Sequence, residues 1–455
     1  MKTMLRNKRA ALALLCVLFL LLAGCGSVAA PTSADSRSSA SFGTGPVSSG
    51  KESGGDEINS PDTCAPEAFP AEDKSSDHLS VAAGLREYGM DSAGIPALAE
   101  ASAPEAGGPV DIPAEPLDPG SPLTLTAGEW NDNTNWSFFT NLVTGGTVRF
   151  PSFGIDPRNR IAVTVRDEGG NPLANEAVVL TSEDGLILWA ARTDYSGAAF
   201  LFFPEGRTPG SVLCGDVTAP VQVTEGTDAQ GVAVYRQAET LELTVTPSAA
   251  PCTGTQIMFI VDTTGSMGDE LAYLQKDFSA ITQRVEGDDV SYCACFYRDD
   301  GDDYVTKLGA FTGDVKAVQE QLAVEYAEGG GDTPEAVDRI LKETLVDFDG
   351  WRDDCVKLAF LIFDAPPHEG TDETLQQAVK AAAQKGIRLI PVVASNAERD
   401  TELFGRALSI CTGGTYVFLT DHSGVGESHL EPIVGDYDVR LLQDLIVEII
   451  ARYQG

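Results

Sequence analysis

Apolar and polar positions follow two different patterns along this chain, and the change between them falls near residue 250. After that point, apolar runs alternate with stretches in which apolar residues recur at helical spacing, as at Leu271, Leu274, Phe278 and Ile281 and again at Val439, Leu442, Ile446 and Ile449. The apolar runs predict strands at 257–261, 290–297, 304–311, 358–363, 387–394 and 415–419. Strands that alternate with amphipathic helices predict a doubly wound α/β domain over residues 254–453.

Short alternating strands, without helices between them, are predicted before that domain. Runs at 161–165, 177–180 and 198–203 are separated by turn sequences, such as Gly169-Gly170-Asn171-Pro172 and Ser196-Gly197. This pattern predicts a small all-β sandwich over residues 121–250. The segment from Val163 to Phe200 resembles carboxypeptidase-regulatory-like or bacterial Ig-like domains, which implies a spacer.

The segment 25–120 consists mostly of Ser, Gly, Ala, Pro, Asp and Glu. Such a composition buries too little apolar surface to offset the entropy of ordering, so we predict a disordered stalk.

The first residues are typical of a secretory signal. Basic residues precede an apolar run at 10–23, which predicts a signal peptide over 1–24. The run ends in Leu22-Ala23-Gly24-Cys25, which resembles the lipobox of bacterial lipoproteins. The resemblance implies that Cys25 is acylated and anchors the protein to the bacterial cell membrane, on its extracytoplasmic face. The alternative is an ordinary signal peptide with a chance cysteine.

Composition excludes one class of partner. The 455 residues include 31 Lys and Arg against 68 Asp and Glu, a formal net charge of −37. Nucleic-acid binding requires clustered cations, so we expect no nucleic-acid partner.

The segment Asp262-Thr263-Thr264-Gly265-Ser266-Met267 directly follows the strand predicted at 257–261. A tight turn here directs the oxygens of Asp262, Thr264 and Ser266 the same way, and Gly265 eases that turn. One carboxylate and two hydroxyls are hard ligands, suited to Mg²⁺, Mn²⁺ or Ca²⁺. The alternative is a capping box, in which Ser266 and Asp269 open the next helix.

Two later loops offer further oxygen ligands. Thr333 lies in Gly329-Gly330-Gly331-Asp332-Thr333-Pro334-Glu335, and Asp364 ends the strand predicted at 358–363. A doubly wound sheet can bring all of these loops to the carboxyl ends of its strands.

The three loops together resemble the von Willebrand factor A (vWA) domain and its metal-ion-dependent adhesion site, over roughly residues 256–452. The resemblance implies that Asp262, Thr264, Ser266, Thr333 and Asp364 bind one divalent cation, Mg²⁺ by preference. It also implies that an open position on this ion attracts a carboxylate from a protein partner. The strand order of the family implies neighbouring first and fourth strands, and hence a possible disulfide between Cys252 and Cys355.

These features predict a lipid-anchored surface protein that binds a protein partner through a metal and is not an enzyme. An envelope assembly factor or signalling scaffold that uses the same site remains an alternative. A metal-dependent hydrolase is less favoured, because the chain has no H-E-x-x-H motif and no G-x-S-x-G elbow. His368 is the residue most like a catalytic base, but the family motif contains it as a loop residue.

Overall fold

The computed structural model describes residues 125–145, 148, 157–204, 206–227, 231, 233–237, 240–331, 333–423 and 428–455. All of them belong to one compact unit, Ala114–Gly455. The predicted signal peptide, the lipidation site at Cys25 and the predicted stalk lie outside the described residues. Within the described part, none of the helices has both the length and the apolar character needed to cross a membrane.

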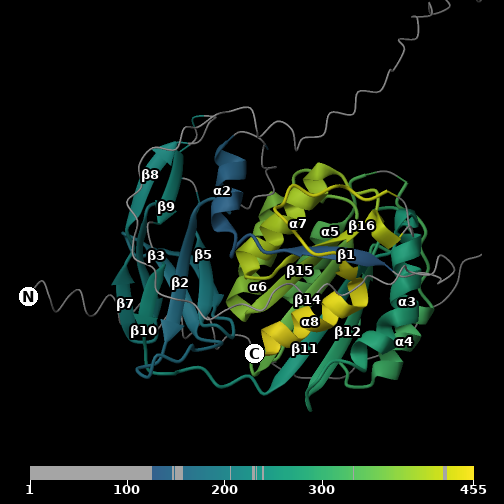
Figure 1. Ribbon diagram of the computed structural model, residues 1–455, viewed down its shortest axis with the longest axis horizontal. Helices are drawn as coiled ribbons and strands as arrows, with labels where there is room; N and C mark the ends of the chain where they lie inside the picture. The colour runs from purple at the N-terminus through teal and green to yellow at the C-terminus, as the bar shows by residue number, and fades with distance from the viewer. Residues whose placement is uncertain are drawn as a thin grey trace, which may run out of the picture. The chain divides into compact units, whose positions relative to one another are not determined.

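The α/β domain is built on an eight-stranded sheet (Figure 1). Its spatial order is β13 (Thr306–Lys307), β12 (Val290–Tyr297), β11 (Gly254–Asp262), β14 (Cys355–Phe363), β15 (Ile387–Val393), β16 (Tyr416–Thr420), β1 (Thr126–Trp130) and β17 (Arg440–Leu441). β12, β11, β14, β15 and β16 run parallel, whereas β13 and β1 are antiparallel to their neighbours. The chain leaves β11 first towards β12 and later returns to β14 on the other side, so the strand order reverses at β11.

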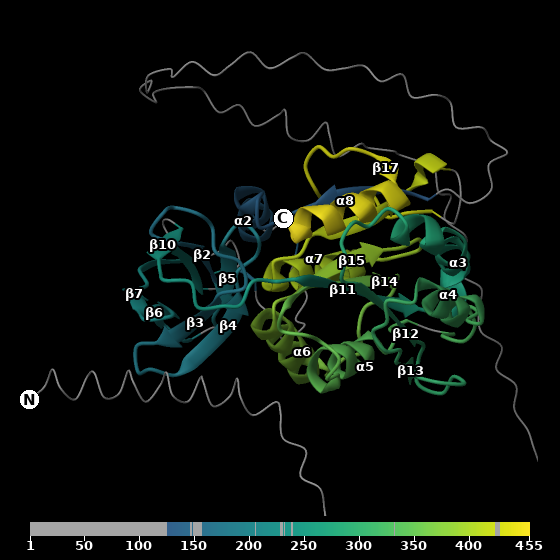
Figure 2. The same ribbon diagram turned by 90° about the horizontal axis from the view of Figure 1, so that it is seen from below.

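Helices cover both faces of this sheet (Figure 2). One face packs against α3 (Gly268–Thr282), α4 (Val315–Ala323) and α8 (Leu442–Gln454). The other face packs against α5 (Val337–Lys342), a π-helical turn (Glu343–Asp347), α6 (Asp372–Lys385) and α7 (Arg399–Thr412). All nine residues of β11 are buried, as expected for a parallel strand that is covered on both sides. This mixed sheet with helices on both faces has the predicted doubly wound α/β architecture.

Two of the predicted elements are shorter than expected. Only Thr306–Lys307 of the strand predicted at 304–311 pairs with β12. Tyr304 lies outside the ladder, and its hydroxyl forms hydrogen bonds with Thr263 and Glu325. Val439, predicted in the last apolar stripe, is 37% exposed and precedes α8.

The first described strand corrects the predicted boundary between the two domains. β1 was expected in the sandwich at 121–250, but it pairs with β16 from Thr126↔Thr420 to Trp130↔Tyr416. It is followed by α2 (Trp136–Thr144). Leu125 and Ala127 pack in the same core as α3 and α8, so burial of apolar side chains places this segment in the α/β sheet. The sandwich is therefore inserted between two strands of that sheet.

The sandwich itself contains the strands that were predicted. One sheet has the order β10 (Leu241–Thr244), β2 (Arg160–Arg166), β5 (Ala198–Phe202), and the other β4 (Ile187–Arg192), β3 (Ala177–Ser182), β6 (Pro209–Cys214), β7 (Val217–Pro220). A hairpin joins β8 (Val223–Thr227) to β9 (Ala233–Gln237). Trp189 of β4 and Phe202 of β5 meet edge to face, with ring centroids 5.1 Å apart, and so connect the two sheets.

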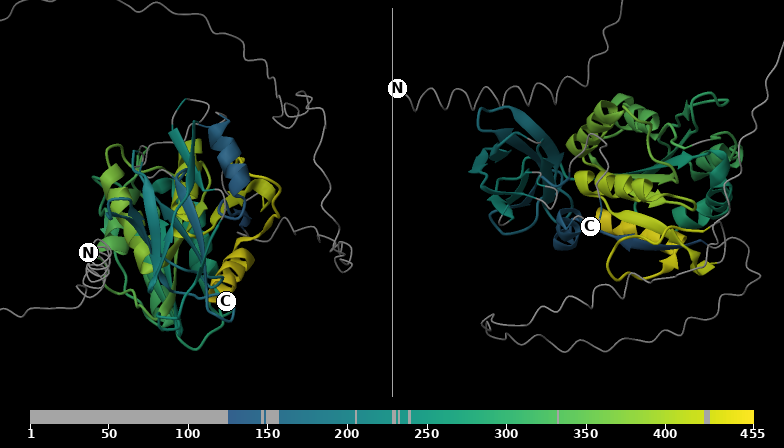
Figure 3. Two further views of the ribbon diagram at one scale, coloured as in Figure 1. Left: turned by 90° about the vertical axis from the view of Figure 1, so that its left-hand side faces the viewer. Right: turned by 90° about the horizontal axis from the view of Figure 1, so that it is seen from above.

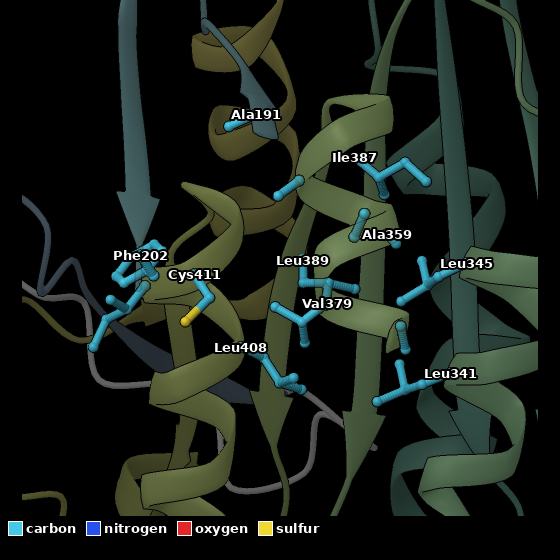
Figure 4. Packing of buried hydrophobic residues seen from close by; sticks show 14 of the residues in the cluster. Ala191, Phe202, Leu341, Leu345, Ala359, Val379, Ile387, Leu389, Leu408 and Cys411 are labelled. Atoms are coloured by element: carbon cyan, nitrogen blue, oxygen red, sulfur yellow. The ribbon is translucent and has the colours of Figure 1, made fainter. Parts of the chain in front are cut away.

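Apolar side chains continue without interruption from the sandwich into the α/β domain. Phe202 of β5, Cys411 of α7, Val379 of α6 and Leu389 of β15 belong to one buried cluster (Figure 4). The ring of Tyr195, in the sandwich, also lies 6.3 Å from that of Tyr453, in α8. The C-terminus lies at the end of α8 (Figure 3). The shared core makes the two domains one packing unit.

Candidate metal centre

The first loop of the candidate site begins where β11 ends. Asp262 is fully buried, and its Oδ1 accepts hydrogen bonds from the backbone amide (2.9 Å) and the hydroxyl (2.7 Å) of Thr264. The hydroxyls of Thr264 and Ser266 lie 3.4 Å apart. A short 3₁₀ turn, Gly265–Met267, then leads into α3, whose start has no side-chain capping bond. The capping-box alternative is therefore wrong, and the three oxygen-bearing residues gather as predicted.

The second loop crosses directly over the first. The amide of Gly265 donates to the carbonyl of Gly329 (3.1 Å), and the amide of Glu328 donates to that of Thr263 (3.1 Å). Gly330 has a φ of +70°, and a Cβ added there would lie 2.9 Å from Cβ of Thr264. Only glycine lets the two loops approach so closely.

The third loop follows β14. Asp364 is 8% exposed, and its carbonyl accepts a hydrogen bond from the hydroxyl of Thr401 (3.1 Å). Burial raises the pKa of its carboxyl, and the hydroxyl of Ser266 opposes that shift. Because β11 and β14 are neighbours at the point where the strand order reverses, their carboxyl ends leave a crevice between the loops.

These loops enclose a cavity of about 250 Å³, here called the metal-site cavity. Four of the five predicted ligand residues line it, namely Thr264, Ser266, Thr333 and Asp364. The fifth, Asp262, lies beneath Thr264 and bonds to it. The structure thus brings together every residue predicted for the site.

Some buried carboxylate oxygens of the candidate ligands have no hydrogen-bond partner. Asp262 Oδ2 and Asp364 Oδ1 are both buried without a partner. Burial, and for Asp262 also the nearby charge of Asp364, raises the pKa of both carboxyls above the ordinary range. A buried carboxylate without a partner is destabilising, and a divalent cation would satisfy both oxygens at once. The donor set therefore fits a hard cation.

Glu335 is a member of the site that sequence reasoning missed. It lines the metal-site cavity, is 4% exposed, and its Oε2 has no hydrogen-bond partner. Its amide donates to the carbonyl of Pro366 (3.1 Å), which ties it to the third loop. Burial, followed by the charges of Asp262 and Asp299, raises the pKa of Glu335 to about 9. The sequence did contain one signal for Glu335, since its carboxylate lies two positions after the predicted ligand Thr333.

Carboxylates alone would not be enough to bind a metal ion at the metal-site cavity. Among the described residues, no group of three or more His, Cys, Asp or Glu side chains is arranged to hold a metal ion. An ion at this position needs the hydroxyls of Thr264, Ser266 and Thr333 as well as the carboxylates. Such a mixed oxygen set suits Mg²⁺, Mn²⁺ or Ca²⁺ better than zinc.

The acidic segment 299–303, which precedes β13, packs against the second loop and stabilises it. Asp302 Oδ2 accepts hydrogen bonds from the amides of Gly330 (2.9 Å) and Asp299 (3.1 Å). Asp299 is 8% exposed and lies 2.6 Å from Nε2 of His368. Asp299 and Asp302 are therefore packed against the loops, whereas Asp300 and Asp303 are exposed.

The two cysteines of the predicted disulfide are free thiols in the structure. They lie near the starts of neighbouring strands, as expected, but Cys355 is in register with Gly254, two positions after Cys252. This offset corrects the assumption that the strand ends match, and the predicted bond is not formed. Cys25, the predicted lipidation site, lies outside the described residues.

Comparison with known proteins agrees with the fold of the C-terminal domain. Residues 256–425 match the profile of the family described as von Willebrand factor A domain. A protein of Acanthamoeba polyphaga mimivirus, described as ariadne-like RING finger protein, is 26% identical over 213 residues, or 42% of this chain. The chain spans about a fifth of the length of that relative. The matched profile and the doubly wound sheet together show that this chain contains a von Willebrand factor A domain.

Proposed function

We propose that the chain is a lipid-anchored surface protein whose vWA domain binds a divalent cation and, through it, a carboxylate of a protein partner. A vWA domain supports a general role in protein binding or adhesion. The observation that carries the metal-dependent proposal is the meeting of three separate loops around two unpartnered, buried carboxylate oxygens.

Asp262, Thr264, Ser266, Thr333 and Asp364 would hold the ion, and Glu335 is placed to join them. The bound cation supplies a positively charged centre that can accept an oxygen ligand from outside. Serine and threonine hydroxyls stay neutral, so they leave part of that charge uncompensated. Ser266 and Thr333 are exposed, so a partner's side chain can reach the ion from solvent.

We infer a binding role rather than catalysis. His368 does not line the metal-site cavity, and its Nε2 is engaged by Asp299. The membrane anchor rests on the lipobox-like sequence that ends in Cys25. An extracytoplasmic position on the bacterial cell membrane follows from that anchor.

The proposal is tested by titration of the full chain with Mg²⁺ and Mn²⁺, followed by pull-down from the native envelope with and without EDTA. We expect saturable binding of the metal and loss of the partner on chelation. Asp262→Asn should abolish both, because it removes the charge while it keeps the side-chain volume. Asp288→Asn is the matched control, since this exposed residue precedes β12 at the opposite edge of the sheet. Metal uptake that is equal in both variants would refute the proposal.

The same experiment addresses the alternative of an envelope assembly factor or scaffold. Matrix or cell-surface proteins among the captured partners support adhesion. Neighbouring envelope proteins support the scaffold, with the same metal site in use.

A further inference from the structure

A second, larger cavity lies between the sandwich and the amino ends of the sheet strands. It has a volume of about 360 Å³, which is within the size range of small-molecule sites. Three basic side chains line it: Arg192 from β4, Lys357 from β14 and Arg388 from β15. We call it the basic cavity.

The nitrogens of these side chains donate to backbone carbonyls rather than to carboxylates. Nζ of Lys357 donates to the carbonyl of Lys385 (2.8 Å). Two guanidinium nitrogens of Arg388 donate to the carbonyls of Thr412 and Arg192 (2.8 Å each). One nitrogen of Arg192 donates to the carbonyl of Asn175 (2.9 Å). Within the described part of the chain, none of the three cations forms an ion pair.

Two of these cations are also shielded from water. Lys357 is 2% exposed and Arg388 is 6% exposed. Burial, followed by the charge of Arg192, lowers the pKa of Lys357 to about 8. Buried cations without a counterion are destabilising, and a buried anion would relieve that penalty.

The carboxylates in the cavity wall are occupied elsewhere. Glu176 and Asp194 both line the cavity. Each is held by backbone amides and a serine hydroxyl of nearby segments, at Ser248 and Ala249 for Glu176 and at Ser196 and Ala198 for Asp194. They therefore satisfy local donors and leave the three cations without a carboxylate partner.

We propose that the basic cavity binds a small molecule that carries an oxyanion group, phosphate or carboxylate. Arg192 reaches the ligand from the sandwich, and Lys357 and Arg388 reach it from the sheet. The bound anion thus bridges the two domains. This site lies at the opposite edge of the sheet from the metal-site cavity and does not depend on the proposed metal-dependent function.

Calorimetric titration of the full chain with inorganic phosphate and with citrate, in low-chloride buffer, tests the proposal. We expect saturable binding of at least one of them, and the preferred anion identifies the phosphate or carboxylate source. Lys357→Met and Arg388→Met should each weaken binding about tenfold or more, because each removes charge-assisted hydrogen bonds. Lys316→Met is the control, since this side chain on α4 is 81% exposed.

A measurement on the wild-type chain keeps the test valid if the variants fail to fold. Cys252 is half-buried and lines the basic cavity. Saturating phosphate or citrate should slow its alkylation by iodoacetamide, as followed by mass spectrometry of the Cys252 peptide. Absence of saturable binding by both anions would overturn the proposal. So would binding that leaves alkylation of Cys252 unchanged, or that is equal in the folded variants and wild type.

Discussion

The two cavities lie at opposite ends of one strand and have opposite charge. Lys357 lies near the start of β14, in the basic cavity, and Asp364 follows its end, in the metal-site cavity. At one end buried cations lack carboxylate partners, and at the other buried carboxylate oxygens lack donors. In each case the proposed ligand would neutralise a buried charge.

The cavities differ in how they are built. The metal-site cavity is formed by loops of the α/β domain alone, each directly after a strand or before a helix. The basic cavity needs both domains, because Arg192 comes from the sandwich. The metal-site cavity therefore depends on the fold of the α/β domain alone, whereas the basic cavity exists only when the two domains pack together.

The largest expected effect is the loss of metal-dependent stability in Asp262→Asn. For wild type at a Mg²⁺ concentration a hundredfold above the dissociation constant, we expect about 2.7 kcal/mol of added stability. The variant should show none of this gain, although it should be at least as stable as wild type without metal, because one buried carboxylate charge is removed. Urea denaturation with and without Mg²⁺ measures both effects. If Mg²⁺ stabilised the variant as much as wild type, the metal-site cavity would not be the binding site.

A smaller effect is expected from Gly330→Ala. Its Cβ would lie 2.6 Å from Oε1 of Glu335 and 2.9 Å from Cβ of Thr264, so the loops must separate. We expect Mn²⁺ affinity to fall at least tenfold, about 1.4 kcal/mol, as measured by calorimetry.

Gly331→Ala is the matched control for that change. Gly331 also has a positive φ, +101°, but nothing lies within 4 Å of an added Cβ. Both variants carry backbone strain of about 1–3 kcal/mol, and only Gly330→Ala adds the clash at the site. Equal affinity losses would mean that close approach of the loops is unimportant for the metal.

The pH dependence of stability should differ in sign between the cavities. The pKa of Glu335 is raised from 4.5 to about 9, so between these values the unfolded chain releases a proton that the folded chain keeps. Its contribution to stability therefore falls as pH rises through this window. The pKa of Lys357 is lowered from 10.5 to about 8, so the unfolded chain keeps a proton that the folded chain has lost. Its contribution rises between about pH 8 and 10.5.

Variants separate these two contributions. Metal-free Glu335→Gln should lose less stability than wild type between about pH 5 and 9. Lys357→Met should lack the gain above about pH 8. Denaturation curves across this range measure both differences, and slopes unchanged in either variant would contradict the assigned environment.

The smallest effect is expected for coupling between the cavities. Lys357 and Asp364 are seven positions apart on an extended strand, which separates them by about 23 Å. The stability gains from Mg²⁺ and from phosphate should therefore add within about 0.5 kcal/mol. Denaturation with each ligand alone and with both together tests this, and a larger coupling would mean that the sheet transmits one binding event to the other site.

The sequence predicted much of the fold because each prediction used local spacing. Leu271, Leu274, Phe278 and Ile281 are all buried on one face of α3, as their periodicity indicated. The strands predicted at 290–297 and 358–363 lie within β12 and β14. The match to the vWA profile over residues 256–425 agrees with the resemblance drawn from the loop motifs.

Long-range strand pairing explains the features that local spacing did not predict. β1 lies about 290 positions before β16, and its short sequence carries no signal of that partner. Pro391 disfavours a central strand, yet it is tolerated in β15, where pairing to β16 includes only Val392 and Val393.

The sequence alone identified the candidate ligands of the metal-site cavity, because Asp262, Thr264, Ser266 and Asp364 follow strand ends that meet at one edge of a doubly wound sheet. Thr333, which precedes α5, was added by the resemblance to the vWA domain. Only the tertiary structure decided that Glu335 joins them, that Cys355 lies opposite Gly254, and that Arg192 meets Lys357 and Arg388. These outcomes depend on burial and register between segments far apart in the chain, and local periodicity carries no information about either.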